Sequence, residues 1–201
     1  MKIAVFVSGN GSNLQALLDA EASGTLGKGK ISLVISDNPE AAALKRASNA
    51  GKQIFVLEPK DFNSRERYDE EIIKKLKEKK IEGVVLAGFM RILSGIFVNQ
   101  YKYKILNIHP SLLPKFKGAH AIRAAFKAGE KETGVTVHFV TQELDAGPII
   151  LQEKVVVTEK DTAESLEEKI HKVEHRLYPE AVKLFAQGKV NIKDDKVDIK
   201  V

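Results

Sequence analysis

Two polar side chains near the middle of the chain have the types and the spacing needed for acyl chemistry. Asn107 and His109 lie two residues apart in the stretch 105–118, ILNIHPSLLPKFKG. Residues i and i+2 of a β-strand point to the same face, so an amide and an imidazole would project together. Pro110 disfavours helix at His109, which predicts that the strand ends there and opens into a loop.

A carboxylate, Asp145, lies in a second stretch of this kind, 140–148, where a turn closes another apolar run. Asn107 can donate N–H groups to a developing oxyanion, and a protonated His109 can donate to the same oxygen. Asp145 beside the histidine would raise its pKa and could accept a proton directly or through water. The chain has no cysteine and no serine in a nucleophile-elbow motif. The trio therefore predicts direct acyl transfer to an amine. The alternative is purely structural, with Asn107 and His109 capping the sheet edge and Asp145 stabilising its turn.

The composition restricts the classes of protein and of site that the chain can form. The 201 residues suffice for one domain with a buried core, and the 43% apolar and 29% charged content is typical of a soluble protein. The absence of cysteine excludes disulfides, thiolate metal sites and thiol nucleophiles. No apolar run approaches the length of a membrane span, and the first residues lack a signal-type cleavage site, so we expect a cytoplasmic protein. The net charge of +5 allows an anionic substrate or nucleic acid and establishes neither.

Alternating strand and helix patterns predict an α/β fold with a single domain. Strands are expected over 2–8, 31–36, 53–57, 83–87, 104–108, 133–140 and 148–157, and helices over 14–22, 39–49, 64–80, 119–128 and 162–187. This order indicates a Rossmann-like, mostly parallel central sheet with helices on both faces. The stretch 133–157 resembles a hairpin-like pair of longer strands, so the sheet is expected to be mixed. The tail 189–201 alternates polar and apolar residues and is expected to form a peripheral strand.

A glycine-rich turn, Gly9-Asn10-Gly11-Ser12-Asn13, separates the first expected strand from the first helix. Unpaired N–H groups at a helix N-terminus suit a phosphate. The dinucleotide fingerprint is absent because position 14 is leucine, and the Walker pattern is absent too. Taken alone, the turn fits a capped helix start with Ser12 or Asn13 as N-cap.

The stretch 88–93 places an arginine, Arg91, among bulky apolar residues directly after a strand. It fits core packing, and equally the wall of a pocket for a flat aromatic ligand. Arg65 opens a charged helix, where a cation gains nothing from the helix dipole, so it fits a ligand contact or a surface position. Stretches 9–13, 88–93 and 107–111 all follow strands. Ligands of parallel sheets bind at the carboxyl ends of strands, so these three stretches are expected to converge.

A second motif, His171-Lys172-Val173-Glu174-His175, matches the H-x-x-E-H pattern of some zinc peptidases. Histidines at i and i+4 share a helical face, but a catalytic zinc site needs a third ligand. The acidic residues after His175 lie mostly in the tail. We therefore predict no metal site and a ligand-facing Glu174.

Three stretches together resemble the 10-formyltetrahydrofolate-dependent formyltransferases. They are 8–15 (SGNGSNLQ), 87–93 (AGFMRIL) and 106–114 (LNIHPSLLP), and 138–141 (HFVT) and 144–149 (LDAGPI) continue the match. The resemblance runs from Met1 to about Gly188, which implies a formyltransferase domain over 1–188 followed by the tail. The SGNGSN turn is similar to the corresponding turn of the family members that act on glycinamide ribonucleotide in purine biosynthesis.

The resemblance assigns roles to residues at matching positions. It implies a catalytic trio of Asn107, His109 and Asp145, with His109 as the acid. It implies contacts to the substrate phosphate and ribose from Gly11, Ser12, Asn13 and Glu174. It also implies contacts to the folate from Arg65, Met90, Arg91, Ile92, Leu93 and Asn107.

The implied reaction uses 10-formyltetrahydrofolate as formyl donor and no metal. The partners are then small molecules, with no nucleic acid or membrane, and the protein is a monomer or a homodimer. A tRNA formyltransferase or a formyl-folate hydrolase shares the trio, but each is expected to carry an additional domain. A phosphate- or folate-binding module without catalysis would not need the trio. Three positions depart from the family pattern. Phe116 and Lys117 replace a tyrosine and a proline, and Ala146 replaces a glycine that is needed only at a positive φ.

Overall fold

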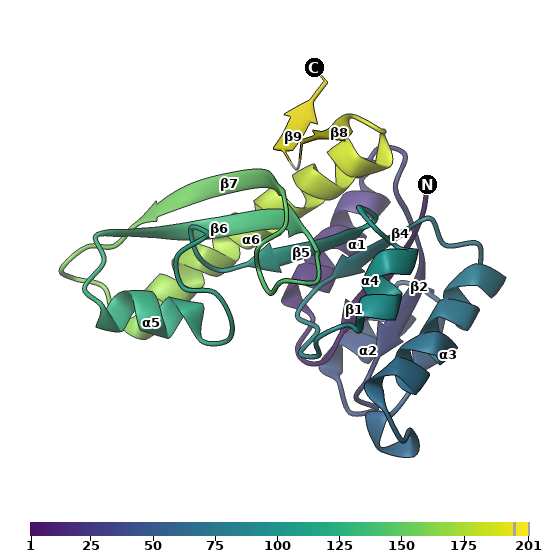
Figure 1. Cartoon of the computed structure of the whole chain (residues 1–201). Coiled ribbons are helices and arrows are strands. Elements are labelled where there is room, and N and C mark those ends of the chain that lie inside the picture. The colour runs from purple at the N-terminus through teal and green to yellow at the C-terminus, as the bar shows by residue number, and fades with distance from the viewer. Residues whose placement is uncertain (195, 201) are drawn as a thin grey trace.

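A seven-stranded mixed sheet forms the centre of the computed structural model, which describes residues 1–194 and 196–200 (Figure 1). Its strands lie in the order β3-β2-β1-β4-β5-β6-β7. The first five strands are parallel to their neighbours, whereas β6 runs antiparallel to β5 and β7 antiparallel to β6. The bounds are β1 Lys2–Val7, β2 Lys30–Ser36, β3 Ile54–Val56, β4 Gly83–Leu86, β5 Ile105–His109, β6 Glu132–Phe139 and β7 Ile149–Val156.

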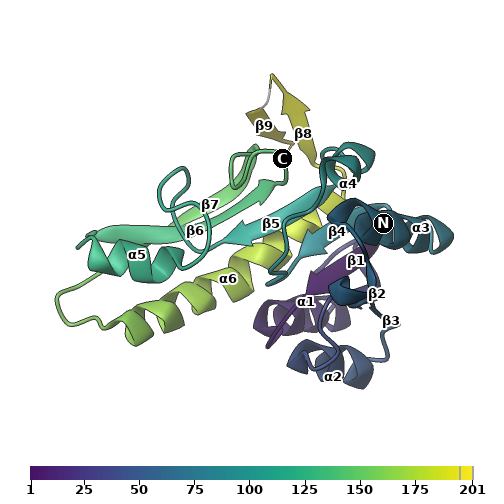
Figure 2. The same cartoon turned by 60° about the horizontal axis from the view of Figure 1, so that its bottom comes forward.

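Helices cover both faces of the sheet (Figure 2). Their bounds are α1 Ser12–Ala22, α2 Ala42–Asn49, α3 Arg65–Glu78, α4 Gly95–Gln100, α5 Ala121–Lys127 and α6 Ala163–Ala186, with a 3-10 turn at Pro59–Asp61. Helices α1, α2 and α6 pack on one face, and α3 and α4 pack on the other. Helix α6 runs beneath β5, β6 and β7. Strands β6 and β7 extend with α5 away from the body of the molecule.

The alternation of β1 shows why the sheet needs helices on both faces. Ile3, Val5 and Val7 are buried against the α1 and α6 side. Ala4 and Phe6 are buried against the α3 and α4 side. A strand that is apolar on both faces buries them only between two helical layers. The predicted Rossmann-like α/β fold with a mixed sheet is therefore confirmed.

Two local expectations were wrong. Gly11 is the N-cap of α1, in the left-handed conformation and without a side-chain cap, so neither Ser12 nor Asn13 has that place. The tail forms two strands, β8 (Val190–Lys193) and β9 (Lys196–Ile199), which pair with each other in a separate sheet. The predicted single strand missed the turn at Asp194, whose φ is 50°.

Helix α4 was also not expected. Ser94 is its N-cap and accepts a hydrogen bond from the backbone N–H of Phe97. Its six residues are too few to show helical periodicity, so the capping serine was the available signal. No helix within residues 1–194 and 196–200 has both the length and the hydropathy that a membrane crossing requires.

Candidate active site

The carboxyl ends of β1, β4 and β5 bring the three expected stretches to one edge of the sheet. Strand β4 lies between the other two, and its last residue, Leu86, pairs with Phe6 on one side and with Asn107 on the other. Beyond the strands, the N–H of Ser8 donates to the carbonyl oxygen of Gly88 at 3.1 Å. The loops after β1 and β4 and the polar end of β5 are therefore neighbours.

His109 and Asp145 meet at this edge, as the sequence predicted. Nδ1 of His109 lies 3.5 Å from Oδ2 of Asp145, and both side chains are almost fully buried. On the other side of the ring, Nε2 donates to the carbonyl oxygen of Phe116 at 2.7 Å. Both ring nitrogens thus face oxygen atoms that can accept hydrogen bonds.

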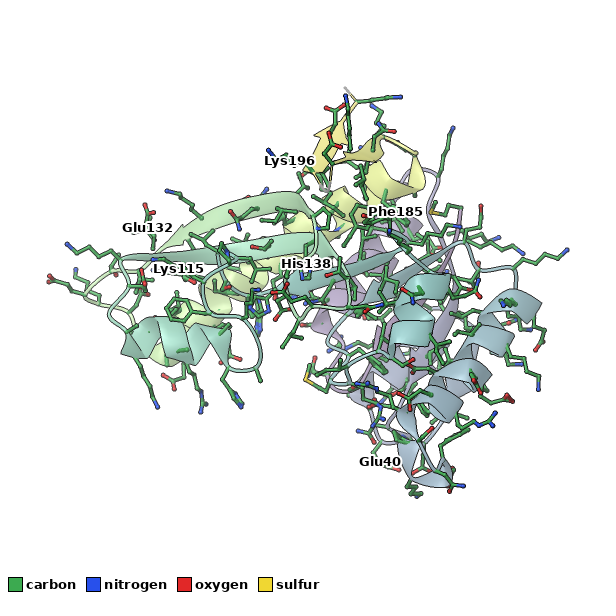
Figure 3. The ribbon with its side chains drawn as sticks, viewed as in Figure 1. Glu40, Lys115, Glu132, His138, Phe185 and Lys196 are labelled. Carbon is green, nitrogen blue, oxygen red and sulfur yellow. The ribbon has the colours of Figure 1, made fainter. Side chains whose placement is uncertain are left out.

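Asn107 reaches this pair through His138, its partner in the register of β5 and β6. Nδ1 of His138 lies 2.9 Å from the carbonyl oxygen of Phe139 and must donate to it. Burial lowers the pKa of His138, which favours the neutral ring. Its Nε2 then accepts from the Asn107 amide at 3.3 Å and lies 3.7 Å from Oδ1 of Asp145. Figure 3 shows His138 near the middle of the molecule, between the body and the extension formed by β6 and β7.

The shape of the turn that carries Asp145 depends on the backbone conformations of Asp145 and Gly147. Asp145 itself takes the left-handed conformation, with φ 48°. Ala146 does not have a positive φ, so alanine in place of the family's glycine causes no backbone strain there. A Cβ on Gly147 would lie 1.8 Å from the carbonyl oxygen of Phe139, so only glycine fits there. The N–H of Gly118 donates to Oδ2 of Asp145 at 2.8 Å, which ties the loop after Pro114 to the carboxylate.

The start of α1 follows β1 at the same edge of the sheet. Gly11 has φ 77°, and a Cβ there would lie 2.5 Å from Cβ of Ala43. The first turn of α1 holds no acidic residue. Arg46 of α2 donates to the backbone and side-chain oxygens of Asn10 and so fixes the turn. Free N–H groups beside a cation suit an anion such as a phosphate.

Glu174 reaches this helix start from α6, across 161 residues of sequence. Its Oε2 accepts from Nδ2 of Asn13 at 3.1 Å. Glu174 is 5% exposed, and burial raises its pKa. Glu174 therefore lies beside the turn to which the resemblance assigns the substrate phosphate.

The two histidines of the H-x-x-E-H motif do not converge on a common point. His171 and His175 stack with ring centroids 6.2 Å apart. Nε2 of His171 lies 4.0 Å from Oε2 of Glu174. Among the residues that the structure describes, no group of three potential metal ligands is found.

The stretch after β4 presents apolar side chains to solvent. Met90 is 76% and Ile92 60% exposed, whereas Leu93 is buried. The guanidinium of Arg91 lies over the ring of Tyr68, 4.9 Å from its centroid. Arg65 lies one turn before Tyr68 in α3, is exposed, and has Glu66 as its nearest ion-pair partner at 3.7 Å. Exposed apolar groups beside two arginines suit an aromatic, anionic ligand.

His138 is the functional candidate that the motif analysis did not single out for a role. It lies within an apolar strand, where a lone histidine resembles a core residue. Its signal was positional, since strand alternation places it beside Asn107 once β5 and β6 are paired in register.

Comparison with known proteins agrees with this geometry. The formyl transferase family model matches residues 1–182. Phosphoribosylglycinamide formyltransferase of Escherichia coli (strain K12) is 45% identical over 195 residues, which cover 97% of this chain and 92% of that protein. The trifunctional purine biosynthetic protein adenosine-3 of Drosophila melanogaster is 46% identical over 188 residues, which cover 93% of this chain but 14% of the relative. The chain thus spans a small part of that larger protein.

A solved structure extends the agreement to three dimensions. The structure of glycinamide ribonucleotide transformylase 1 from Symbiobacterium toebii has a TM-score of 0.96 and 44% sequence identity, and the match covers 99% of this chain and 93% of that one. The chain therefore belongs to the formyl transferase family, among the phosphoribosylglycinamide formyltransferases.

Proposed function

We propose that the chain transfers the formyl group of 10-formyltetrahydrofolate to the primary amine of glycinamide ribonucleotide, a step of de novo purine biosynthesis. The observation that carries the proposal is the connected set Asn107–His138–Asp145–His109, in which an amide, a carboxylate and an imidazole meet at one edge of the sheet. The named relatives support the choice of substrates.

The reaction begins with attack of the amine nitrogen on the formyl carbon. As the C–N bond forms, the carbonyl oxygen becomes an oxyanion. The amide of Asn107, oriented by His138 before the charge develops, donates to that oxygen and lowers the barrier. The protonated ring of His109 donates to the same oxygen after its Nε2–H leaves the carbonyl oxygen of Phe116. Asp145 takes the proton that leaves the attacking amine, directly or through water. The carbonyl then re-forms as the bond between the formyl carbon and N10 breaks, and the proton that Asp145 took from the amine passes to N10, directly or through water.

The ribonucleotide is held at the start of α1. The backbone N–H groups of Gly11, Ser12 and Asn13 bind its phosphate, helped by the positive end of the helix dipole. Glu174 binds the ribose hydroxyls. Its carboxylate already accepts from Asn13, which holds it beside the phosphate site.

The folate lies against the stretch after β4. Met90, Ile92 and Leu93 contact its pterin ring, and Arg65 and Arg91 face its anionic tail. Asn107 adjoins this stretch through the pairing of β4 and β5. The formyl group of the folate therefore lies beside Asn107 and faces the amine of the ribonucleotide. These substrates are small molecules, with no nucleic acid, membrane or metal, and the proposed location is the cytoplasm. A monomer or a homodimer is compatible with this site.

The test follows the absorbance of a 10-formyl folate as it loses its formyl group, with and without glycinamide ribonucleotide. Loss that depends on the ribonucleotide is expected. Equal loss without it would identify water as the acceptor and the chain as a formyl-folate hydrolase. No loss in either case would overturn the proposal, and formylation of methionyl-tRNA would then be measured.

A further inference from the structure

Residues 88–94 form an irregular segment between β4 and α4, outside every helix and strand. Two of its apolar side chains, Met90 and Ile92, are exposed and gain no support from a core. An irregular segment has no hydrogen-bond ladder to define its shape. Its conformation therefore depends on contacts with neighbouring elements.

One end of this segment is held by Ser8, which directly follows β1. The N–H of Met90 donates to Oγ of Ser8 at 2.9 Å. The N–H of Ser8 donates in turn to the carbonyl oxygen of Gly88. The hydroxyl of a single serine thus fixes where the segment leaves the sheet.

The other end is held by Asp69 of α3. The N–H of Ser94 donates to Oδ2 of Asp69 at 2.6 Å. Asp69 is 2% exposed and Ser94 is 1% exposed, so neither group has water as an alternative partner. Ser94 also begins α4 as its N-cap. The contact therefore sets both the end of the segment and the start of the helix.

The charges around Asp69 come from the segment and from its own helix. Burial raises the pKa of Asp69, and its hydrogen bonds to Ser94 and the charges of Arg65 and Arg91 oppose that rise. Arg91 also stacks on Tyr68, the residue before Asp69. A buried carboxyl group thus links the helix to the middle and to the end of the segment.

We infer that Asp69 and Ser8 are positioning residues that hold the two ends of segment 88–94 in the shape that binds the formyl donor. The inference rests on the proposed function for the identity of the donor. Neither residue reaches the reacting atoms. Each acts through a backbone N–H of the segment, so its loss weakens donor binding and leaves the chemical step unchanged.

The test compares Asp69→Ala and Ser8→Ala with the wild type. Loss of an acceptor leaves a backbone N–H of the segment unpaired, and we expect the KM for the formyl donor to rise on the order of tenfold in each variant. The kcat and the KM for the ribonucleotide should stay within about twofold of wild type. Asp69→Asn keeps an oxygen acceptor for Ser94 and should restore the donor KM to near the wild-type value.

Glu70→Ala is the matched control, because it removes the adjacent carboxylate of α3, which is exposed and paired with Arg67. It should leave both KM values unchanged. An unchanged donor KM in folded Asp69→Ala would overturn the inference, as would equal rises of both KM values. If Asp69→Ala fails to fold, Ser8→Ala decides, and an unchanged donor KM there overturns it.

Hydrogen exchange of the ligand-free protein separates this inference from the proposed function. The amide of Ser94 should exchange faster in Asp69→Ala, and that of Met90 faster in Ser8→Ala, by about the same factor as the donor KM changes. Unchanged exchange at both amides would contradict the inference whatever the substrate. A wild type that binds no formyl folate would instead contradict the proposed function.

Discussion

Nε2 of His138 lies 3.3 Å from the amide nitrogen of Asn107. Because His138 donates its Nδ1 proton to the backbone of Phe139, Nε2 is left as an acceptor, and this fixes the orientation of the amide. One N–H of Asn107 is thereby engaged and the other is left for a substrate oxygen. A buried neutral histidine thus prepares the donor that the proposed reaction requires.

Asp145→Asn and His109→Ala should each lower kcat by about 10²–10⁴-fold, because each removes a group that moves or donates a proton in the transition state. Steady-state kinetics and circular dichroism should show an inactive but folded enzyme. Glu143→Gln is the control, since it removes a nearby exposed carboxylate paired with Lys117. Near-normal turnover in either catalytic variant would sink this assignment of roles.

Asn107→Ala should lower kcat by about 10²–10³-fold, as expected for loss of one oxyanion donor. Binding of the ribonucleotide should be little changed, because the proposed phosphate site is at α1. Calorimetric titration measures that binding independently of turnover. A loss of ribonucleotide affinity as large as the loss of kcat would show that Asn107 acts in binding instead.

His138→Gln should change how stability depends on pH. Burial lowers the pKa of His138 from its ordinary 6.5, so on acidification the unfolded chain takes up a proton before the folded one does. The stabilisation is present above pH 6.5 and is lost as the pH falls from there through the folded pKa. Thermal unfolding at about pH 7.5 and about pH 5 should therefore show a larger acid destabilisation in the wild type than in the variant. A difference in unfolding free energy that does not vary with pH would contradict the neutral state of His138.

Gly11→Ala should raise the KM for the ribonucleotide on the order of tenfold or more, since it combines a strained positive φ with a clash against Ala43. Gly9→Ala is the matched comparison in the same turn, because a Cβ there meets nothing within 4 Å. We expect a smaller effect from Gly9→Ala. Equal effects of the two substitutions would argue against a conformational role for Gly11.

The sequence predicted the elements whose patterns are long and local. The parallel strands were readable because they are apolar on both faces, and the convergence of stretches 9–13, 88–93 and 107–111 followed from the rule that ligands bind at strand ends. Asn107 and His109 could be paired because i and i+2 share a face.

What the sequence did not reveal depends on pairing between distant elements. The place of His138 beside Asn107 needs the register of β5 and β6. The contact of Asp69 with Ser94 joins α3 to α4 across 25 residues. Helical spacing places Asp69 on the buried face of Ile72 and Ile73, but it does not identify Ser94 as its partner. The left-handed Gly11 cap depends on the packing of α2 against the turn.

The fate of a ¹³C-labelled formyl group is the most direct measure of the central claim. The labelled 10-formyl folate is incubated with glycinamide ribonucleotide and wild-type protein, and the products are separated by mass spectrometry. The proposed mechanism predicts that the label enters the amide of the ribonucleotide product and that Asp145→Asn abolishes this transfer. Label recovered as free formate, at the same rate with and without the ribonucleotide, would contradict it.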